Sequence, residues 1–290
     1  MHIVKPRLIF RIFRTLNKGV PDRFFRYLDL QMRVLRFVRL PSGYHRHTGF
    51  RYWHAVLYGN EREVGEGILK WLKENPSSNK REDVFYTTKL WNSQNGYNNA
   101  KRAIQECFEK VEGLGYIDLL LIHSPLSGSR KRLETYKAMQ EAVDKGIVRS
   151  IGVSNYGVHH IDELLNWNEL KYKPVVNQIE ISPWLMRQEL ADYCKSRGLI
   201  VEAYAPLTHG YKINHPNVLK VAKEAGCNSG QVLIRWSLQH GYVPLPKTKS
   251  VKRLPSNLDV YNIELTQEQI DFLDQPDAYE PTDWECTDAP

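Results

Sequence analysis

The stretch YIDLLLIHSP, residues 116–125, decides the fold of this chain, because it is a mainly apolar run that ends on a histidine. Such a run is typical of a parallel strand that is covered on both faces. Helical stretches separate most of the other strand-like runs, so the order of elements predicts a parallel α/β sheet. The other runs are AVLYGNE (55–61), VFYTTKLW (84–91), SIGVSN (150–155), VVNQIEISPW (175–184), IVEAYAPL (200–207) and YVPLPKTKS (242–250).

Apolar spacing and end signals give the limits of these elements. The predicted strands are Val84–Trp91, Tyr116–Ser124, Ser150–Asn155, Val175–Ser182, Leu199–Ala205 and Tyr242–Thr248. The predicted helices are Glu61–Glu74, Asn98–Glu112, Leu133–Lys145, Val158–Asn166, Gln188–Arg197, Asn217–Ala225, Gly230–His240 and Thr266–Asp274. A closed barrel of eight strands needs two more from residues 1–58, where arginines recur every three or four positions, a spacing that favours a basic helical stripe.

The composition is that of an ordinary globular enzyme, with 42% hydrophobic and 25% charged residues in a chain of 290. This length suits one large α/β barrel or two smaller domains. No window approaches 18 uninterrupted apolar residues, which argues against a membrane partner. The four cysteines have no CxxC spacing, so they predict reduced thiols in a cytoplasmic protein and no zinc or other metal site.

The net charge of +7 is unevenly distributed. Residues 1–54 hold ten Arg and two Lys against two Asp, a net charge of +10, and the remaining residues carry −3. The basic character therefore gives no reason to expect nucleic-acid binding by the body of the protein.

Chemically useful side chains stand at successive strand ends, which converge at one mouth of a barrel. Tyr58, Lys89 and His123 occupy three of these ends. Reduction of a carbonyl group needs a proton for its oxygen and a group that stabilises the developing alkoxide. Tyr58 is the candidate acid, Lys89 the cation that lowers its pKa, and His123 the group that orients the carbonyl. Taken singly, each has a bland alternative as a loop aromatic, a solvated strand end or a packed histidine.

From Ala55 onward the chain resembles the aldo-keto reductases, specifically the small monomeric carbonyl reductases of yeasts and other fungi. The segments AVLYGNE, TTKLW, DLLLIHSP, IGVSNY, VNQIEISPW, EAYAPL and PLPKTK carry the resemblance, in the family's order and approximate spacing. The resemblance implies a (β/α)₈ TIM barrel over residues 55–290, with atypical or missing first strands. It also implies NADPH-dependent reduction of aldehydes, ketones or open-chain sugars by a monomer.

One catalytic position departs from the family pattern. The family places an Asp five residues before its Tyr, where it pairs with the Lys, and here that position is Trp53. We expect a rate loss on the order of 10² or more, because general acid catalysis is worth about 10²–10⁴. Asp22 or Asp29 folding back would be a replacement. The alternative function is a catalytically impaired NADPH-binding barrel or an incomplete gene product.

The cofactor residues are carried over from the family at matching positions. There is no GxGxxG, so a classical dinucleotide fold is not indicated. Lys247, Thr248 and Arg253 would hold the 2′-phosphate of NADPH, with Asn257 on the adenine. Ser154, Asn155 and Gln178 would bind the nicotinamide carboxamide, and Tyr204 would stack on the ring. Without the resemblance, each could be a solvated loop residue or a plain polar strand end.

Two tryptophans and the tail are assigned to the substrate. Trp91 and Trp184 are expected to line an apolar pocket for a small carbonyl compound. The acidic tail Asp277–Pro290, with Trp284, would close over this pocket as the family's C-terminal loop does, or else remain a surface segment.

The Arg-rich segment 1–54 has three interpretations. The first is a mitochondrial presequence, but the single Ser and the two Asp of the segment count against it. The second is a basic arm that binds nucleic acid or an anionic membrane. The third is that the segment is not the family's proper N-terminus but a misplaced exon or a shifted reading frame. The abrupt start of the resemblance favours this third interpretation.

Overall fold

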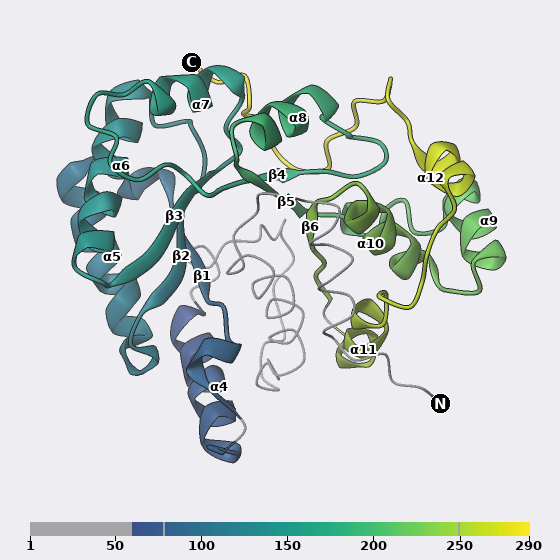
Figure 1. Cartoon of the computed structure of the whole chain (residues 1–290), viewed down its shortest axis with the longest axis horizontal. Helices are drawn as coiled ribbons and strands as arrows, with labels where there is room; N and C mark the ends of the chain where they lie inside the picture. The colour runs from purple at the N-terminus through teal and green to yellow at the C-terminus, as the bar shows by residue number, and fades with distance from the viewer. Residues whose placement is uncertain (1–59, 78, 249) are drawn as a thin grey trace.

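The computed structural model describes residues 60–77, 79–248 and 250–290. Its centre is one curved parallel sheet, around which the helices are arranged (Figure 1). The strands are β1 (Thr87–Leu90), β2 (Ile117–Ile122), β3 (Val148–Ser154), β4 (Val176–Glu180), β5 (Ile200–Tyr204) and β6 (Val243–Leu245). Each strand pairs in parallel with the next one along the chain, in the order β1 to β6.

The predicted α/β class and the six strands from Val84 onward are confirmed. Connecting successive parallel strands through a helix is the arrangement of a barrel wall. The two further strands that an eight-stranded barrel needs fall on residues 1–59, outside the described residues, as do Tyr58, Trp53 and the whole Arg-rich segment.

Helices follow most strands and cover the outer face of the sheet (Figure 1). They are α4 (Glu61–Glu74), α5 (Tyr97–Lys110), α6 (Ser129–Asp144), α7 (Val158–Leu165), α8 (Gln188–Ser196), α9 (Pro216–Glu224), α10 (Ser229–Gln239), α11 (Leu254–Leu258) and α12 (Gln267–Leu273). Local chemistry explains several ends. Thr266 and Gln269 form the predicted capping box of α12, and Gly146 takes the left-handed conformation (φ +72°) just after α6.

The observed elements differ from the predicted ones mainly at their ends. Strand β6 spans only Val243–Leu245, because Pro244 and Pro246 supply no backbone N–H for a sheet ladder. Helix α6 begins at Ser129 rather than Leu133, since its first turn is polar and carries no apolar spacing. The short helix α11 was not predicted from the sequence.

The two sides of the sheet have different roles. The large core lies between the sheet and the helices, and a smaller inner cluster of Leu119, Leu121 and Val176 packs with Phe85 and Ile200. These inner residues alternate along their strands, as the period of a β-strand requires. Continuing the same alternation toward the strand ends reaches Lys89, His123, Gln178 and Glu202. The inner face therefore changes from apolar to polar toward its carboxyl end.

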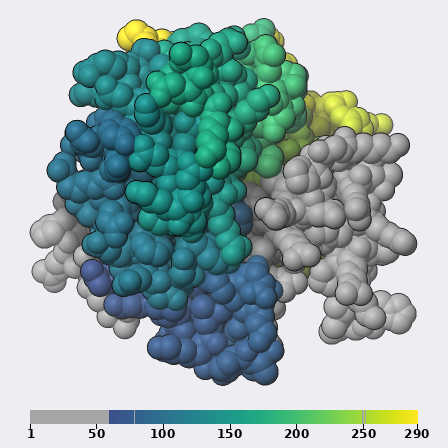
Figure 2. Space-filling view, turned by 60° about the vertical axis from the view of Figure 1, so that its left-hand side comes forward, coloured from purple at the N-terminus to yellow at the C-terminus, as the bar shows by residue number. Residues whose placement is uncertain are grey.

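The remaining surface is formed by the helical layer. In the space-filling view, α4 and the residues after it form the lower end of the described surface (Figure 2). Among the described residues no helix is both long and apolar enough to cross a membrane.

Candidate active site

Five predicted residues meet at the carboxyl ends of β2 to β5. Ser154 Oγ donates a hydrogen bond to the backbone oxygen of Gln178 at 2.8 Å. Asn155 Nδ2 donates to the backbone oxygen of His123 at 3.1 Å, and the Tyr204 hydroxyl donates to Asn155 Oδ1 at 3.0 Å. All but Tyr204 are buried, and Tyr204 is half-buried. The network thus spans four neighbouring strands at the mouth.

Lys89 enters this network through an amide. Its side chain is buried, and Nζ donates to Gln178 Oε1 at 2.5 Å. The ring of Tyr204 lies 5.9 Å from the same nitrogen. Burial lowers the pKa of Lys89 to about 7, against the opposing effect of the Asp283 carboxylate. In the part of the chain that the structure describes, Lys89 makes no ion pair.

His123 is surrounded by aromatic rings. Its ring centroid lies 4.7 Å from that of Trp91, in an edge-to-face arrangement, and 5.9 Å from that of Trp284. The two tryptophans are 5.8 Å apart. Trp91 and Trp284 thus form an aromatic wall beside a buried imidazole, which is the setting that an apolar carbonyl pocket needs.

Trp184, the second predicted pocket residue, has different neighbours. Its ring packs against His215 at 5.1 Å and lies 5.4 Å from Lys212 Nζ. The structure therefore brings Trp91, but not Trp184, into ring contact with His123.

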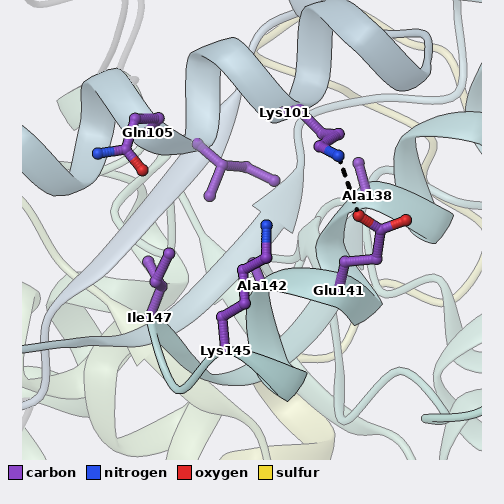
Figure 3. A pocket seen from close by; sticks show the side chains of 8 residues that line it. Lys101, Gln105, Ala138, Glu141, Ala142, Lys145 and Ile147 are labelled. Atoms are coloured by element: carbon purple, nitrogen blue, oxygen red, sulfur yellow. Dashed lines mark ion pairs between the residues drawn. The ribbon is translucent and has the colours of Figure 1, made fainter.

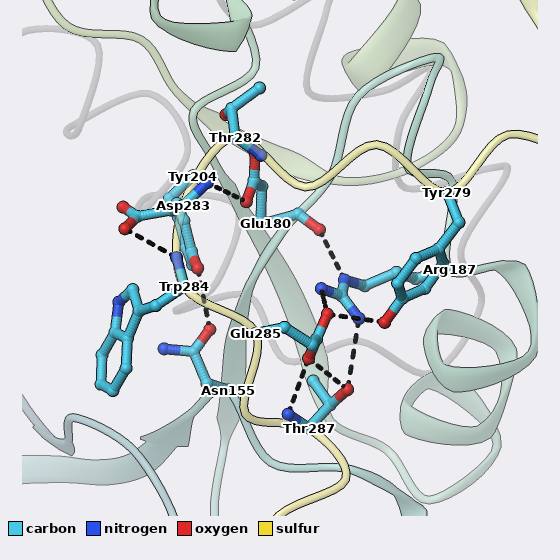
Figure 4. A network of polar contacts seen from close by, with 10 residues as sticks. All are labelled: Asn155, Glu180, Arg187, Tyr204, Tyr279, Thr282, Asp283, Trp284, Glu285 and Thr287. Atoms are coloured by element: carbon cyan, nitrogen blue, oxygen red, sulfur yellow. Dashed lines mark hydrogen bonds and ion pairs between the residues drawn. The ribbon is translucent and has the colours of Figure 1, made fainter.

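The tail forms a strap across the mouth, defined here as residues 275–290. Glu180, at the end of β4, accepts hydrogen bonds from the backbone of Thr282 and Asp283 at 2.8 and 3.1 Å (Figure 4). Arg187 pairs with Glu285, and Tyr279 also donates to that carboxylate at 2.7 Å. Burial opposes ionisation of Glu285, but these hydrogen bonds lower its pKa to about 2. Two charged anchors therefore hold Asp283 and Trp284 over the strand ends.

The end of the strap is seated on α7. His160 Nδ1 accepts the backbone N–H of Gly157 at 3.0 Å, so its proton lies on Nε2, which donates to the Ala289 oxygen at 2.6 Å. A Cβ on Gly157 would lie 2.1 Å from the Thr287 oxygen. This close approach requires glycine and fixes the position of the strap.

Strained backbone accompanies the site. Asn155 and Ala205 directly follow β3 and β5 and have φ of +60° and +47°. Thr208 and His209, in the loop after β5, also have positive φ. Non-glycine residues adopt this region at a cost, and such strain concentrates at functional sites.

The predicted phosphate clamp follows β6. Lys247 and Arg253 are exposed, Thr248 is half-buried, and Asn257 is buried in α11. Because β6 pairs with β5, with Leu245 opposite Tyr204, the clamp begins at the same end of the sheet as the first network. The structure therefore places the clamp on the strand next to the one that carries Tyr204.

A separate shallow pocket lies in the helical layer. It is formed between α5 and α6 near the start of β3, and Lys101 and Glu141 form an ion pair across it at 3.3 Å (Figure 3). This is the opposite end of the sheet from the polar strand ends, and none of the predicted site residues lines it.

Sequence reasoning missed two carboxylates of the site. Glu202 lies in the middle of β5 and is fully buried beside Gln178, and Asp283 is the strap residue whose charge acts on Lys89. The alternation of IVEAY was the available signal for Glu202, because it puts the acid on the same face as Ile200 and Tyr204.

A parallel α/β sheet with a buried lysine, a histidine and amide side chains at its strand ends defines a barrel-type enzyme site. The aldo/keto reductase family profile matches residues 48–213 and 214–278. The chain therefore belongs to the aldo/keto reductase family, a family of oxidoreductases. The match begins at residue 48, slightly before Ala55, where the quoted motifs begin.

Similar proteins are named as oxidoreductases or reductases. An oxidoreductase of Saccharomyces cerevisiae is 74% identical over 243 residues, which are 83% of this chain and 86% of that protein. A glyoxal reductase of Bacillus subtilis is 40% identical over 220 residues, or 76% of each chain.

Solved structures agree with the fold. A Bombyx mori aldo-keto reductase in complex with NADP is 29% identical, with a TM-score of 0.70 over 89% of this chain and 84% of that one. An aldo-keto reductase from a deep-sea metagenome library is 37% identical, with a TM-score of 0.69 over 75% of this chain and 78% of the other.

Proposed function

We propose that this protein reduces small aldehydes, ketones or open-chain sugars to alcohols with NADPH, inside a closed (β/α)₈ barrel whose first two strands come from residues 1–58. One observation carries the proposal: Lys89, His123, Ser154, Asn155, Gln178 and Tyr204 belong to one hydrogen-bonded assembly at the strand ends. We further expect a cytoplasmic monomer.

The residues present fit NADPH. The side-chain amides of Asn155 and Gln178 are the kinds of donor and acceptor that a carboxamide needs, and among the described residues each amide oxygen accepts a single hydrogen bond. Lys247 and Arg253 are exposed cations suited to a phosphate. Tyr204 offers a ring beside the amides, held by its bond to Asn155. NADPH supplies the hydride when it is bound.

The chain's own residues then supply the proton and its control. Tyr58, which lies outside the described residues, is the proposed acid. The Lys89 ammonium stabilises the phenolate that forms, since a nearby positive charge lowers the pKa of a phenol. His123 orients the carbonyl oxygen, and Trp91 and Trp284 exclude water around it.

The similarity to a glyoxal reductase supports a small carbonyl substrate. The aromatic wall beside His123 favours a planar or apolar carbonyl compound that fits between the two indoles. Trp184 would contribute a more distant wall of the same pocket.

A second function is an NADPH-binding barrel with impaired turnover. The sequence places Trp53 where the family has its Asp, and among the described residues the only side chain that hydrogen-bonds Lys89 Nζ is an amide. A lysine without a direct carboxylate loses its charge more easily.

A steady-state assay of the full chain with a small aromatic aldehyde tests both functions. Turnover with a clear preference for NADPH over NADH supports the proposed reductase. Quenching of protein fluorescence by NADPH without turnover supports the impaired barrel. An absence of both binding and turnover would contradict the two proposals together. The Arg253→Leu variant is the control for specific binding, because it should weaken NADPH more than NADH.

A further inference from the structure

A fully buried carboxylate lies behind the proposed site. Glu202 in β5 has no exposed surface, and it stands directly opposite Gln178 in the register of β4 and β5. Gln178 Nε2 donates to Glu202 Oε2 at 2.6 Å. The second oxygen, Oε1, is buried and has no hydrogen-bond partner among the described residues. A buried carboxyl group with one unused oxygen is costly, so it requires an explanation beyond packing.

Gln178 connects this carboxylate to Lys89. A glutamine amide has one oxygen and one NH₂ group, and only one of its two flipped orientations can serve both neighbours. With the NH₂ directed to Glu202, the oxygen must face Lys89 Nζ, where it accepts the hydrogen bond of 2.5 Å. Two hydrogen bonds therefore join the lysine to Glu202 through one amide.

A second buried glutamate shows what an ordinary structural role looks like. Glu61, at the start of α4, is also buried, but Oε1 accepts from Thr88 at 2.6 Å and Oε2 accepts from Lys110 at the same distance. Both of its oxygens are used and its cation bonds it directly. Among the residues that the structure describes, the Glu202 carboxyl group hydrogen-bonds only the amide that contacts Lys89, so its contacts point to that lysine.

We propose that Glu202 is a positioning residue for Lys89: it fixes the orientation of the Gln178 amide and supplies a negative charge two hydrogen bonds from the ammonium group. In this arrangement the carboxylate partly replaces the Asp that the sequence lacks at Trp53. Among the described residues, Lys89 is also influenced by the Asp283 carboxylate of the strap and lies 5.9 Å from the ring of Tyr204.

Burial acts on both Glu202 and Lys89. Burial raises the pKa of Glu202 to about 8, while burial lowers that of Lys89 to about 7. Burial favours the neutral form of each group. The opposite charge of the other group would counter this effect. The proposal adds the attraction between the two charges, so it predicts that their titrations are coupled.

The role in catalysis rests on the proposed function, but the first test does not. Lys89 is titrated by NMR in full-length protein carrying [¹³C]lysine, with its signal assigned from Lys89→Met. Glu202→Gln keeps an acceptor for Gln178 and removes only the charge. We expect the Lys89 midpoint to fall by about one to two pH units, as for unit charges about 7 Å apart at an effective dielectric of about 20. Glu202→Asp retains a carboxylate and should stay closer to the unchanged protein.

Two further variants separate Glu202 from its alternatives. Asp118→Asn removes a buried carboxylate from the amino end of the same sheet and should leave the Lys89 midpoint unchanged. Asp283→Asn tests the strap. A lower Lys89 midpoint in Glu202→Gln supports the proposal, whether or not Asp283→Asn also lowers that midpoint. An unchanged midpoint in Glu202→Gln overturns it, and a fall in Asp283→Asn alone would assign the counter-charge to the strap.

Kinetics extend the test to the reaction. In Glu202→Gln the alkaline limb of kcat/KM should move to lower pH by the same amount as the Lys89 midpoint, with NADPH binding by fluorescence little changed. An alkaline limb that stays in place while the midpoint moves would overturn the catalytic part of the proposal. If the unchanged chain neither binds NADPH nor reduces carbonyls, the proposed function fails, and the titration still decides the coupling of Glu202 and Lys89.

Discussion

The two ends of the sheet solve the problem of buried charge differently. At the amino end, Asp118 at the start of β2 accepts from Arg81 at 2.7 Å and from the Tyr86 backbone at 2.9 Å. Arg81 also donates to three backbone oxygens. At the carboxyl end, Lys89 has an amide instead of a carboxylate, and Glu202 keeps an oxygen without a partner among the described residues.

The difference separates stability from chemistry. The satisfied ion pair at one end fixes the strands in position, and the incompletely compensated groups at the other have pKa values near neutrality. The strain at Asn155 and Ala205 is also at the carboxyl end. Removing a charge should therefore affect folding at the amino end and turnover at the carboxyl end.

The largest expected effect is on turnover when Lys89 is changed to Met. We expect kcat/KM to fall about 10²–10⁴-fold, because the charge that assists proton transfer is lost. Thermal unfolding should shift little or upward, since a buried ammonium is replaced by an apolar group of similar length. Steady-state kinetics and circular dichroism on the same sample check this. If Lys89→Met instead lowered stability and left the rate per folded molecule unchanged, Lys89 would serve stability and not turnover, which contradicts the comparison of the two ends.

The next effect belongs to the amino end. Asp118→Asn should lower the free energy of unfolding by about 1–3 kcal/mol, because Arg81 loses its buried charged acceptor. The rate per folded molecule should be unchanged. Urea unfolding and active-site titration with NADPH measure the two quantities. A rate loss like that of Lys89→Met would show that the two ends are not independent.

A smaller effect concerns the cofactor. Arg253→Leu should raise the KM for NADPH about tenfold and leave that for NADH nearly unchanged, because an exposed guanidinium serves only the phosphate that NADH lacks. Lys252→Leu, which removes a neighbouring exposed cation, is the matched control. Equal losses in both variants would indicate a general electrostatic attraction instead of a specific clamp.

Much of this architecture could be predicted from the sequence. Apolar runs followed by polar residues located six strands and placed Lys89, His123, Ser154 and Gln178 at their ends. Glu202 could not be assigned a role in this way. The alternation of IVEAY gives the face on which Glu202 lies, but its partner follows from the register of β4 against β5, which no local pattern contains.

The strap shows the same limit at longer range. Its acidic composition suggested either a pocket lid or a surface tail, and the pairing of Arg187 with Glu285 decides between them across 98 positions of sequence. A contact of that separation depends on how the curved sheet brings distant segments together, so a single sequence gives no local signal for it.

The smallest expected effect is the pH dependence of the strap, which concerns its anchoring on His160 and not the chemistry of the site. Burial, with the charges of His159 and Arg132, lowers the pKa of His160 to about 4, below its ordinary value of 6.5. Between these values the unfolded chain binds more protons, so the stability of the folded state falls as pH drops from about 6.5 to 4. Protonation places a hydrogen on Nδ1, which then cannot accept the Gly157 N–H.

Hydrogen exchange of the strap amides against pH measures this directly. We expect protection of residues 286–289 to decrease over that range, while the amides of β2 at the centre of the sheet remain protected. In His160→Asn an amide group can make both contacts without titrating, so the pH dependence should flatten. If the strap amides lose protection in the same way in this variant, the pH dependence does not come from His160. It would then be assigned to the carboxylates beside Arg187, at the carboxyl end of the sheet.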